Sequence, residues 1–371
     1  MSSQADLLRT PLYDAHVAAG ARMVEFAGWS MPLLYTGILD EQARTRSDAT
    51  IFDVSHMGRL RIRGDLAFKL LDRACTADVA VQEDNTTRYS LLCNEAGGVI
   101  DDVIVYRFPE EWLVVCNASN RQKVLAHLQA VNEAGNFGAK IEDRTLATAM
   151  LAIQGPNAIE KLAKVLPFDV TGLAPKAVAT GSYLVFSYTA SRTGYTGEAG
   201  LEVILPALAA GKAWGFITSE KAGVTPAGLG ARDLLRLEAA LPLYGHELNE
   251  TIDPISAGLG RAVRERGGFV GAEAIARIRQ VGPARRLVGL RLEGPRIARQ
   301  GALVLADGLE VGVVSSGTFS PSCKAPIAMA FVDRRFADGG RELQVMIRPT
   351  EGVKAQIVPR PFYRGSAYKK G

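Results

Sequence analysis

Apolar residues recur along this chain at two different spacings, and the spacings predict a mixture of helices and strands. Recurrence every three or four residues predicts helices, and β-branched runs bounded by turn residues predict strands. Strands are expected at Leu60–Gly64, Tyr89–Cys93, Val99–Phe108, Trp112–Cys116, Ala149–Gln154, Tyr183–Thr189 and Leu201–Leu205. Helices are expected at Leu66–Ala74, Arg121–Ala134 (capped by Asn117–Asn120), Ala158–Leu166, Ala213–Ala222 and Ala231–Leu241. Helices mixed with hairpin-like strands indicate an α+β fold.

The pattern changes after Arg285. Short Val, Leu and Ile runs separated by Gly, Pro and Asp follow, at Leu287–Leu292, Gly312–Ser316, Ile327–Val332 and Leu343–Ile347. This pattern predicts a separate, mostly β domain at the C-terminal end. With 371 residues the chain is long enough for two or three domains.

Composition excludes several classes of protein. The net charge of +4 comes without a concentrated basic patch, so nucleic-acid binding is not expected. The four cysteines lack zinc-site spacing and the histidines are scattered, so no metal is expected. The first residues resemble neither a secretion signal nor a transit peptide, and no apolar run is long enough to cross a membrane. We therefore expect a soluble, cytoplasmic protein with no membrane partner.

Two adjacent acids interrupt the apolar run "GGVIDDVIVYRF". Side chains alternate along a strand, so Asp102 shares a face with Ile104 and Tyr106, and Asp101 takes the opposite face. We expect Asp101 to bind the backbone of the turn after Gly98. Asp102 lies deeper in the run and is expected to face a cavity, although alternation alone leaves open which face borders it.

A second candidate lies in "SRTGYTGEAGLEVIL", where Glu202 stands between two apolar strand residues. Its three glycines would let the backbone turn tightly and approach a ligand closely. A carboxylate in this place either faces water or accepts two hydrogen bonds from a planar ligand with adjacent N–H donors.

The third candidate stretch is "GLGARDLLRLEAALPLYG". Helical periodicity places Arg232, Asp233, Arg236 and Glu238 on its polar side, with Asp233 and Arg236 expected to form a surface pair. Arg232 lies in the first turn, where a cation opposes the helix dipole. A ligand or carboxylate partner, or solvent, would then accept its hydrogen bonds.

Six stretches, in order over nearly the whole chain, resemble one family. They are "GARMVEFAGWSMPLLY", "FDVSHMG", "GGVIDDVIVY", "RTGYTGEAGLE", "GLGARDLLRLEA" and "SSGTFSP". Together they resemble the aminomethyltransferase (T-protein) of the glycine cleavage system. The resemblance implies transfer of the methylene carbon from the aminomethyl-lipoyl arm of the partner H-protein to tetrahydrofolate, with release of ammonia.

The resemblance also implies an architecture. Two ferredoxin-like α+β domains and a C-terminal Greek-key β domain would surround a central folate cavity. The implied bounds are residues 1–54 with 148–250 for the first domain, 55–147 with 251–279 for the second, and 280–371 for the third.

The same resemblance assigns roles to individual residues. Asp102 would be the catalytic carboxylate beside the bridging nitrogen of the folate, with Arg232 near the reacting centre. Glu202 would anchor the pterin ring. The remaining implied folate contacts are Tyr89, Tyr106, Tyr195, Asn117, Met57 and Tyr363.

Three positions depart from the family pattern. Gln42 stands where histidine is usual, Thr50 where glycine is usual, and Arg261 where tryptophan is common. None of them belongs to the set formed by Asp102, Glu202 and Arg232. Arg261 could alter the cavity rim or the entrance for the lipoyl arm.

Two alternatives share the fold that the resemblance implies. A folate-dependent demethylase of a small methyl donor would need no lipoyl carrier, and the intact "FDVSHMG" and "GLGARDLLRLEA" stretches favour aminomethyl transfer instead. A folate-binding iron–sulfur assembly factor would carry a K-G-C-type signature. The corresponding stretch here, "RGGFVGAEA", has no cysteine.

Overall fold

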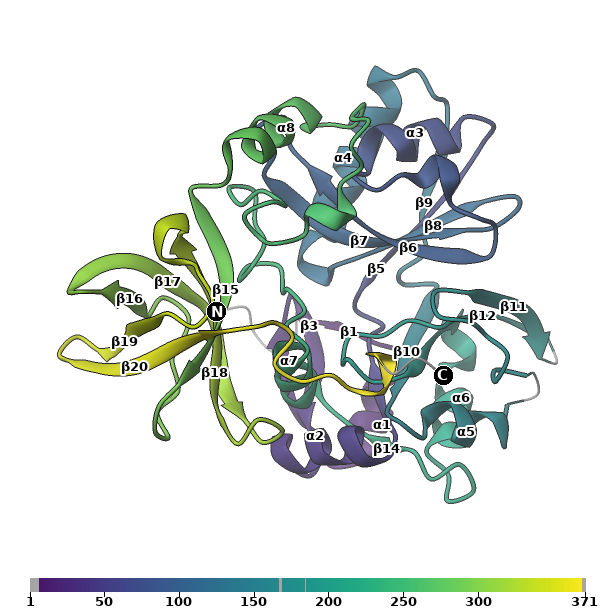
Figure 1. Cartoon of the computed structure of the whole chain (residues 1–371). Coiled ribbons are helices and arrows are strands. Elements are labelled where there is room, and N and C mark those ends of the chain that lie inside the picture. The colour runs from purple at the N-terminus through teal and green to yellow at the C-terminus, as the bar shows by residue number, and fades with distance from the viewer. Residues whose placement is uncertain (1–6, 167–168, 184, 369–371) are drawn as a thin grey trace.

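The computed structural model describes residues 7–166, 169–183 and 185–368, and four sheets organise these residues. Figure 1 shows two α/β portions one above the other, with a β-barrel beside them. The fold is therefore the mixed α+β arrangement that the sequence predicts, followed by a β domain.

The upper portion in Figure 1 is built on a five-stranded sheet in the order β6-β7-β8-β5-β9. Its strands are β6 (Thr86–Cys93), β7 (Val99–Arg107), β8 (Trp112–Cys116), β5 (Gly58–Arg63) and β9 (Lys140–Asp143). Helices α3 (Ala67–Ala74) and α4 (Arg121–Ala134) cover one face with apolar side chains. Burial of this face stabilises the layer, because each apolar side chain removed from water contributes about 1.5–3 kcal/mol.

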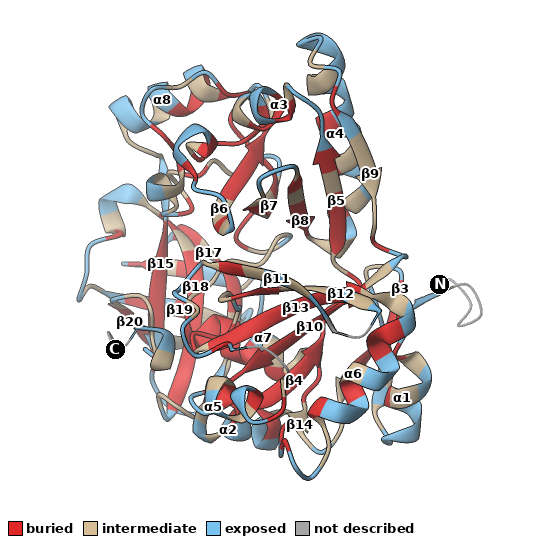
Figure 2. Cartoon of the chain, turned by 90° about the vertical axis from the view of Figure 1, so that its right-hand side faces the viewer, coloured by how far each residue is buried: buried red, intermediate tan, exposed pale blue. Residues whose placement is uncertain are grey.

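The lower portion contains a six-stranded sheet in the order β11-β12-β13-β10-β4-β14. Its strands are β11 (Val178–Tyr183), β12 (Phe186–Ser191), β13 (Gly200–Pro206), β10 (Thr148–Gln154), β4 (Thr50–Asp53) and β14 (Thr225–Pro226). Helices α1 (Tyr13–Ala18), α5 (Ala158–Ala163) and α6 (Ala210–Ile217) pack on one face. Figure 2 shows buried central strands beside helices whose outer faces are exposed.

A small sheet and two helices complete this portion. The sheet has the order β1-β3-β2, with β1 (Leu8–Arg9), β3 (Trp29–Leu34) and β2 (Arg22–Phe26). Helix α7 (Leu229–Glu238) lies against both β3 and α2 (Ile38–Ser47). A Cβ on Gly228 would stand 2.3 Å from the carbonyl oxygen of Leu33, so only glycine allows this close approach. The start of α7 is thereby fixed against β3.

The C-terminal domain is a closed antiparallel barrel of six strands in the order β15-β18-β17-β16-β19-β20. The strands are β15 (Arg285–Leu292), β16 (Leu303–Ala306), β17 (Leu309–Ser320), β18 (Ala325–Asp333), β19 (Glu342–Arg348) and β20 (Glu351–Val358). Helix α8 (Ala272–Val281) precedes the barrel and packs against the five-stranded sheet. The predicted β domain is confirmed.

Several predicted element bounds are wrong. The strand expected near Tyr183–Thr189 is β12, which begins at Phe186 and ends at Ser191, whereas Tyr183 ends β11 and pairs with Phe186. Leu184 lies outside the described residues. Helix α5 ends at Ala163 rather than Leu166, and α6 begins at Ala210 and ends at Ile217. Alanine-rich stretches have no strong start or stop signal, so their periodicity does not define the ends.

A core between the two larger sheets positions the candidate site. It joins Tyr106 and Val115 of the five-stranded sheet to Phe52, Met150 and Ile204 of the six-stranded sheet. Residues of α7 belong to the same core. Side chains on the inner face of either sheet therefore approach the same region. No helix among residues 7–166, 169–183 and 185–368 is long and apolar enough to cross a membrane.

Candidate active site

Asp102 lies on the inner face of the five-stranded sheet. Its strand neighbours Ile104 and Tyr106 belong to the core between the sheets, whereas Val103 and Val105 face α3 and α4. Alternation along β7 therefore places Asp102 toward the six-stranded sheet. Asp102 therefore lies on the face that the five-stranded sheet turns toward the six-stranded sheet.

Glu202 lies on the inner face of the opposite sheet. Leu201 and Val203 pack toward α5 and α6, and Ile204 belongs to the core between the sheets. Alternation along β13 places Glu202 on the side of Ile204. Two acids from different sheets thus face the region that α7 borders.

Two side chains hold the Asp102 carboxylate. Tyr89 donates its hydroxyl proton to Oδ2 over 3.1 Å, and the amide nitrogen of Asn117 donates to Oδ1 over 2.7 Å. Burial raises the pKa of Asp102, and these two hydrogen bonds oppose the rise because they favour the charged form. Burial, together with the charge of Asp102, also raises the pKa of Tyr89, which keeps Tyr89 a hydrogen-bond donor.

The sequence predicts that Asp101 binds the backbone of the turn after Gly98, and this prediction is wrong. Its carboxylate accepts hydrogen bonds from the backbone N–H of Asn117 at 2.9 Å and from the amide groups of Asn117 and Asn120 at 2.8 and 2.7 Å. The reason is that β8 ends opposite Val103, and the chain then turns into the space beside Asp101. Asp101 is fully buried.

The proton affinity of Asp101 is unusually high for a carboxyl group. Burial first, and the charge of Asp102 second, raise the pKa of Asp101 to about 7, although three N–H donors lower it. The amide of Asn120 is used for this bond, and it makes no capping bond to α4. Asn120 is still the N-cap residue of α4, within the predicted segment Asn117–Asn120.

Arg232 projects from the first turn of α7 into the same region. Its guanidinium carbon lies 4.8 Å from the centre of the Tyr195 ring, and Nη2 lies 4.0 Å from the sulfur of Met57. Nη1 is buried and has no hydrogen-bond partner among the described residues. Burial lowers the pKa of Arg232, and the charge of Glu202 opposes this. An unpaired buried guanidinium nitrogen is a donor available to a ligand.

Glu202 and Tyr106 are linked through hydroxyl groups. Oε2 of Glu202 accepts a hydrogen bond from Thr193 over 2.5 Å, and the hydroxyl of Tyr106 lies 3.0 Å from that of Ser191. Tyr106 is fully buried, and burial raises its pKa. The sequence singled out Glu202 and Tyr106 but missed Thr193 and Ser191, whose only signal is their place in the stretch before β13.

Tyr195 and Tyr363 occupy different environments. The hydroxyl of Tyr195 donates to the carbonyl of Pro242, and burial raises the pKa of Tyr195. Within the described residues, Tyr363 lies against Arg46, whose guanidinium carbon is 4.2 Å from the ring centre, and the backbone N–H of Tyr363 donates to the backbone carbonyl of Glu238. The predicted site residues therefore fall into three groups by direct contact. One group contains Asp102, Tyr89 and Asn117. A second contains Arg232, Tyr195 and Met57, and Tyr363 lies apart from both, against Arg46.

Two family matches cover most of the chain. Residues 12–266 match the family described as the GCVT N-terminal domain, and residues 285–364 match the glycine cleavage T-protein C-terminal barrel domain. The chain belongs to the glycine cleavage T-protein family. Its activity is that of an aminomethyltransferase of the glycine cleavage system.

Individual T-proteins are similar over their full length. The aminomethyltransferase of Moorella thermoacetica is 45% identical over 364 residues, which cover 97% of this chain and 99% of the relative. That of Rubrobacter xylanophilus is 44% identical over 365 residues, covering 96% of this chain and 95% of the relative. The crystal structure of the glycine cleavage system aminomethyltransferase T from Bartonella henselae superposes with a TM-score of 0.90 at 34% identity, over 98% of this chain and 100% of that chain.

Two of the three departures from the T-protein pattern have clear partners. The side-chain amide of Gln42 donates to both carboxylate oxygens of Glu238 and to Ser322. The Thr50 hydroxyl lies 2.7 Å from that of Thr45. Arg261 is exposed in a short 3₁₀ helix.

The polar side expected for α7 is wrong at two positions. Arg236 is buried and bonds Glu247 as well as Asp233, and Glu238 is buried and binds Arg46. Helix α7 is enclosed by α2 and by barrel strands β17 and β18 as well as β3, so Arg236 and Glu238 meet protein rather than water, whereas Asp233 stays exposed.

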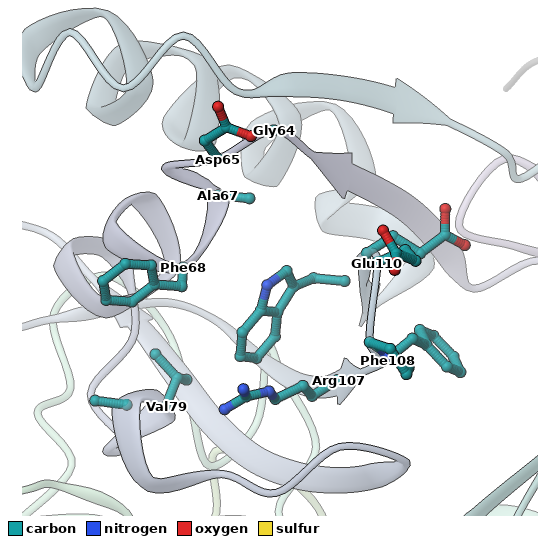
Figure 3. A pocket seen from close by; sticks show the side chains of 12 residues that line it. Gly64, Asp65, Ala67, Phe68, Val79, Arg107, Phe108 and Glu110 are labelled. Atoms are coloured by element: carbon teal, nitrogen blue, oxygen red, sulfur yellow. The ribbon is translucent and has the colours of Figure 1, made fainter.

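The pocket in Figure 3 lies elsewhere in this T-protein. Its volume is about 510 Å³, and it is hollowed between the segment leading into α3 and the turn from β7 to β8. Phe68, Arg107, Phe108 and Glu110 stand around it. None of its lining residues is a predicted site residue. In the part of the chain that the structure describes, no group of His, Cys, Asp and Glu could hold a metal ion.

Proposed function

We propose that this T-protein moves the methylene carbon from the aminomethyl-lipoyl arm of H-protein to tetrahydrofolate, with release of ammonia. The observation that carries the proposal is that Asp102 and Glu202 lie on two different sheets and point toward the same region, with Arg232 at the border of that region. Tetrahydrofolate supplies the nucleophilic nitrogen that accepts the carbon. No metal takes part in this proposal.

The residues present fit a bound folate. Arg232 offers a buried nitrogen without a partner in the described part of the chain. Glu202 has only one of its carboxylate oxygens bonded by Thr193, which leaves acceptor sites for the amino and ring N–H groups of a pterin. Tyr195, stacked on Arg232, would add an aromatic contact. Unfilled polar groups beside an aromatic ring are what a planar polar ligand requires.

Asp102 is proposed as the catalytic carboxylate. Tyr89 and Asn117 hold both of its oxygens, so the side chain is oriented before the ligand binds. Its tasks are to accept a hydrogen bond from the attacking amine and to stabilise positive charge that develops beside it. Such a positioned carboxylate contributes on the order of 10²–10⁴ in rate. Asp101, fully buried, would only support the strand end.

The domain bounds and the topology of each domain belong to the same proposal. The two α/β portions would be ferredoxin-like domains, residues 1–54 with 148–250 and residues 55–147 with 251–279. Residues 280–371 would form a Greek-key barrel, and the three would enclose the folate. Asn117, Met57, Tyr106 and Tyr363 would line or support that cavity. The enzyme would act in the cytoplasm.

The test is product formation from aminomethylated H-protein and tetrahydrofolate. The proposal predicts methylenetetrahydrofolate and ammonia in equal amounts. Methyltetrahydrofolate from a small methyl donor, without need for H-protein, would instead support a demethylase. Folate binding without either product would support an assembly factor.

A further inference from the structure

Three hydroxyl groups form an unbroken line that ends at Glu202. The Thr193 hydroxyl lies 2.5 Å from Oε2 of Glu202, the Ser191 hydroxyl lies 2.7 Å from that of Thr193, and the Tyr106 hydroxyl lies 3.0 Å from that of Ser191. Ser191 and Glu202 are directly opposed across β12 and β13 and therefore share a face. Secondary structure thus builds this line into the fold.

The protons along the line can run in one direction only. An ionised carboxylate is an acceptor without a proton, so Thr193 must donate to Glu202. Each hydroxyl carries one proton, so along this line Ser191 donates to Thr193 and Tyr106 donates to Ser191; the Ser191 hydroxyl also lies 3.4 Å from the backbone carbonyl oxygen of Glu202. Burial, and then the charge of Glu202, raise the pKa of Tyr106, which keeps its donating proton in place. Hydrogen bonds aligned in this way polarise and strengthen one another.

The line also joins the two sheets. Tyr106 lies on β7, four residues after Asp102 and on the same face, at a strand spacing of about 13 Å. Ser191 ends β12 in the other sheet. The position of the Glu202 carboxylate is therefore tied, through Tyr106, to the strand that carries Asp102.

One side of the Glu202 carboxylate stays open. Among the residues described, no group donates a hydrogen bond to Oε1 of Glu202. This oxygen is not fully buried. Glu202 as a whole residue is only 7% exposed. A carboxylate that is held in one orientation, has an unbonded oxygen and is almost excluded from solvent matches a ligand that presents two adjacent N–H donors.

We propose that Thr193, Ser191 and Tyr106 form a one-way hydroxyl relay that sets the orientation of Glu202 and so determines specificity for a ligand with adjacent amino and ring N–H donors. This inference rests on the proposed function, in which that ligand edge is the aminopyrimidine of tetrahydrofolate. The three residues are positioning residues, since they act through Glu202.

The test compares Thr193→Val, which keeps the shape and removes the hydroxyl, with Thr193→Ser, which restores it. Steady-state kinetics with aminomethylated H-protein give the KM for tetrahydrofolate and kcat separately. We expect Thr193→Val to raise KM about ten- to a hundredfold, the effect of losing a hydrogen bond to a charged group, with kcat within about threefold of wild type. Thr193→Ser should return KM to within about threefold.

A second readout separates orientation of Glu202 from a general structural role. Binding of tetrahydrofolate is compared with that of an analogue in which hydrogen replaces the 2-amino group. Thr193→Val should lose most of the wild-type preference for tetrahydrofolate, and Thr193→Ser should keep it. Thr171→Val is the matched control, because exposed Thr171 donates to Asp169 over 2.6 Å away from the site.

The outcomes are separable. Unchanged KM and unchanged preference in Thr193→Val would overturn the relay, as would a loss that Thr193→Ser does not restore although its thermal unfolding matches wild type. If the wild-type protein itself fails to bind tetrahydrofolate, the proposed function is refuted, and the relay is refuted with it.

Discussion

Asp101 and Asp102 are neighbours on β7, and a single nitrogen, Nδ2 of Asn117, donates to both carboxylates over 2.8 and 2.7 Å. Strict alternation would send the two side chains apart. They converge because β8 ends at Cys116, opposite Val103, so both acids lie beyond the last residue pair of β7 with β8, although they still pair with β6. Asn117 fills that space and bonds both carboxyl groups.

The burial of Asp101 beside Asp102 predicts an unusual dependence of stability on pH. The pKa of Asp101 is raised to about 7 by burial and then by Asp102, whereas in the unfolded chain it is about 3.8. Between these values the folded protein keeps a proton that the unfolded chain has released, so this group makes the free energy of unfolding fall as pH rises. Urea unfolding at several pH values should show a steeper fall for wild type than for Asp101→Asn. Parallel curves would contradict the assignment.

Arg46 is expected to be important for stability. It bonds Glu198 at 2.9 Å and Glu238 at 2.8 Å, and both carboxylates are buried. Arg46→Met would leave two buried charges without a cation, which costs about 3–5 kcal/mol in the free energy of unfolding. The control Arg63→Met breaks a half-exposed pair with Glu111 and should cost less than about 1 kcal/mol. Similar losses in both variants, measured by denaturant unfolding, would refute the prediction.

Arg232→Lys is expected to reduce activity rather than stability. The guanidinium stacks on Tyr195, and its buried Nη1 is without a partner in the described part of the chain. Lysine keeps the charge but loses the planar fork and the stacking. We expect kcat to fall about a hundredfold with little change in melting temperature. Arg299→Lys, at an exposed position, is the control and should behave as wild type. Full activity in Arg232→Lys would remove Arg232 from the reacting centre.

Strand patterns predict the local fold well where β-branched runs have clear turn signals. Strand β8 and helix α4 have the predicted bounds, and β7 is one residue shorter than predicted. The roles of Arg236 and Glu238 could not be predicted, because helical periodicity assumes that one face meets water. Their partners come from distant segments, such as Arg46, 192 residues from Glu238 in sequence.

The candidate site is predictable only in part for the same reason. Alternation separates Asp101 from Asp102 and marks Glu202 as distinct from its neighbours, but it cannot say which face of a sheet is the inner one. The core between the sheets decides this, and it depends on which strands pair. Ser191 gains its role through the pairing of β12 with β13, and Thr193 gains its role through the loop that follows β12.

The most direct test of the account compares Asp102→Asn with Asp101→Asn. The measurement is methylenetetrahydrofolate formation from aminomethylated H-protein, alongside tetrahydrofolate binding and thermal unfolding. Asp102→Asn should still bind tetrahydrofolate and fold, but lose turnover by on the order of 10²–10⁴. Asp101→Asn should mainly lose stability, because its new amide group opposes N–H donors, at a cost of about 1–3 kcal/mol. Full turnover in Asp102→Asn, with turnover lost in a well-folded Asp101→Asn, would contradict the account.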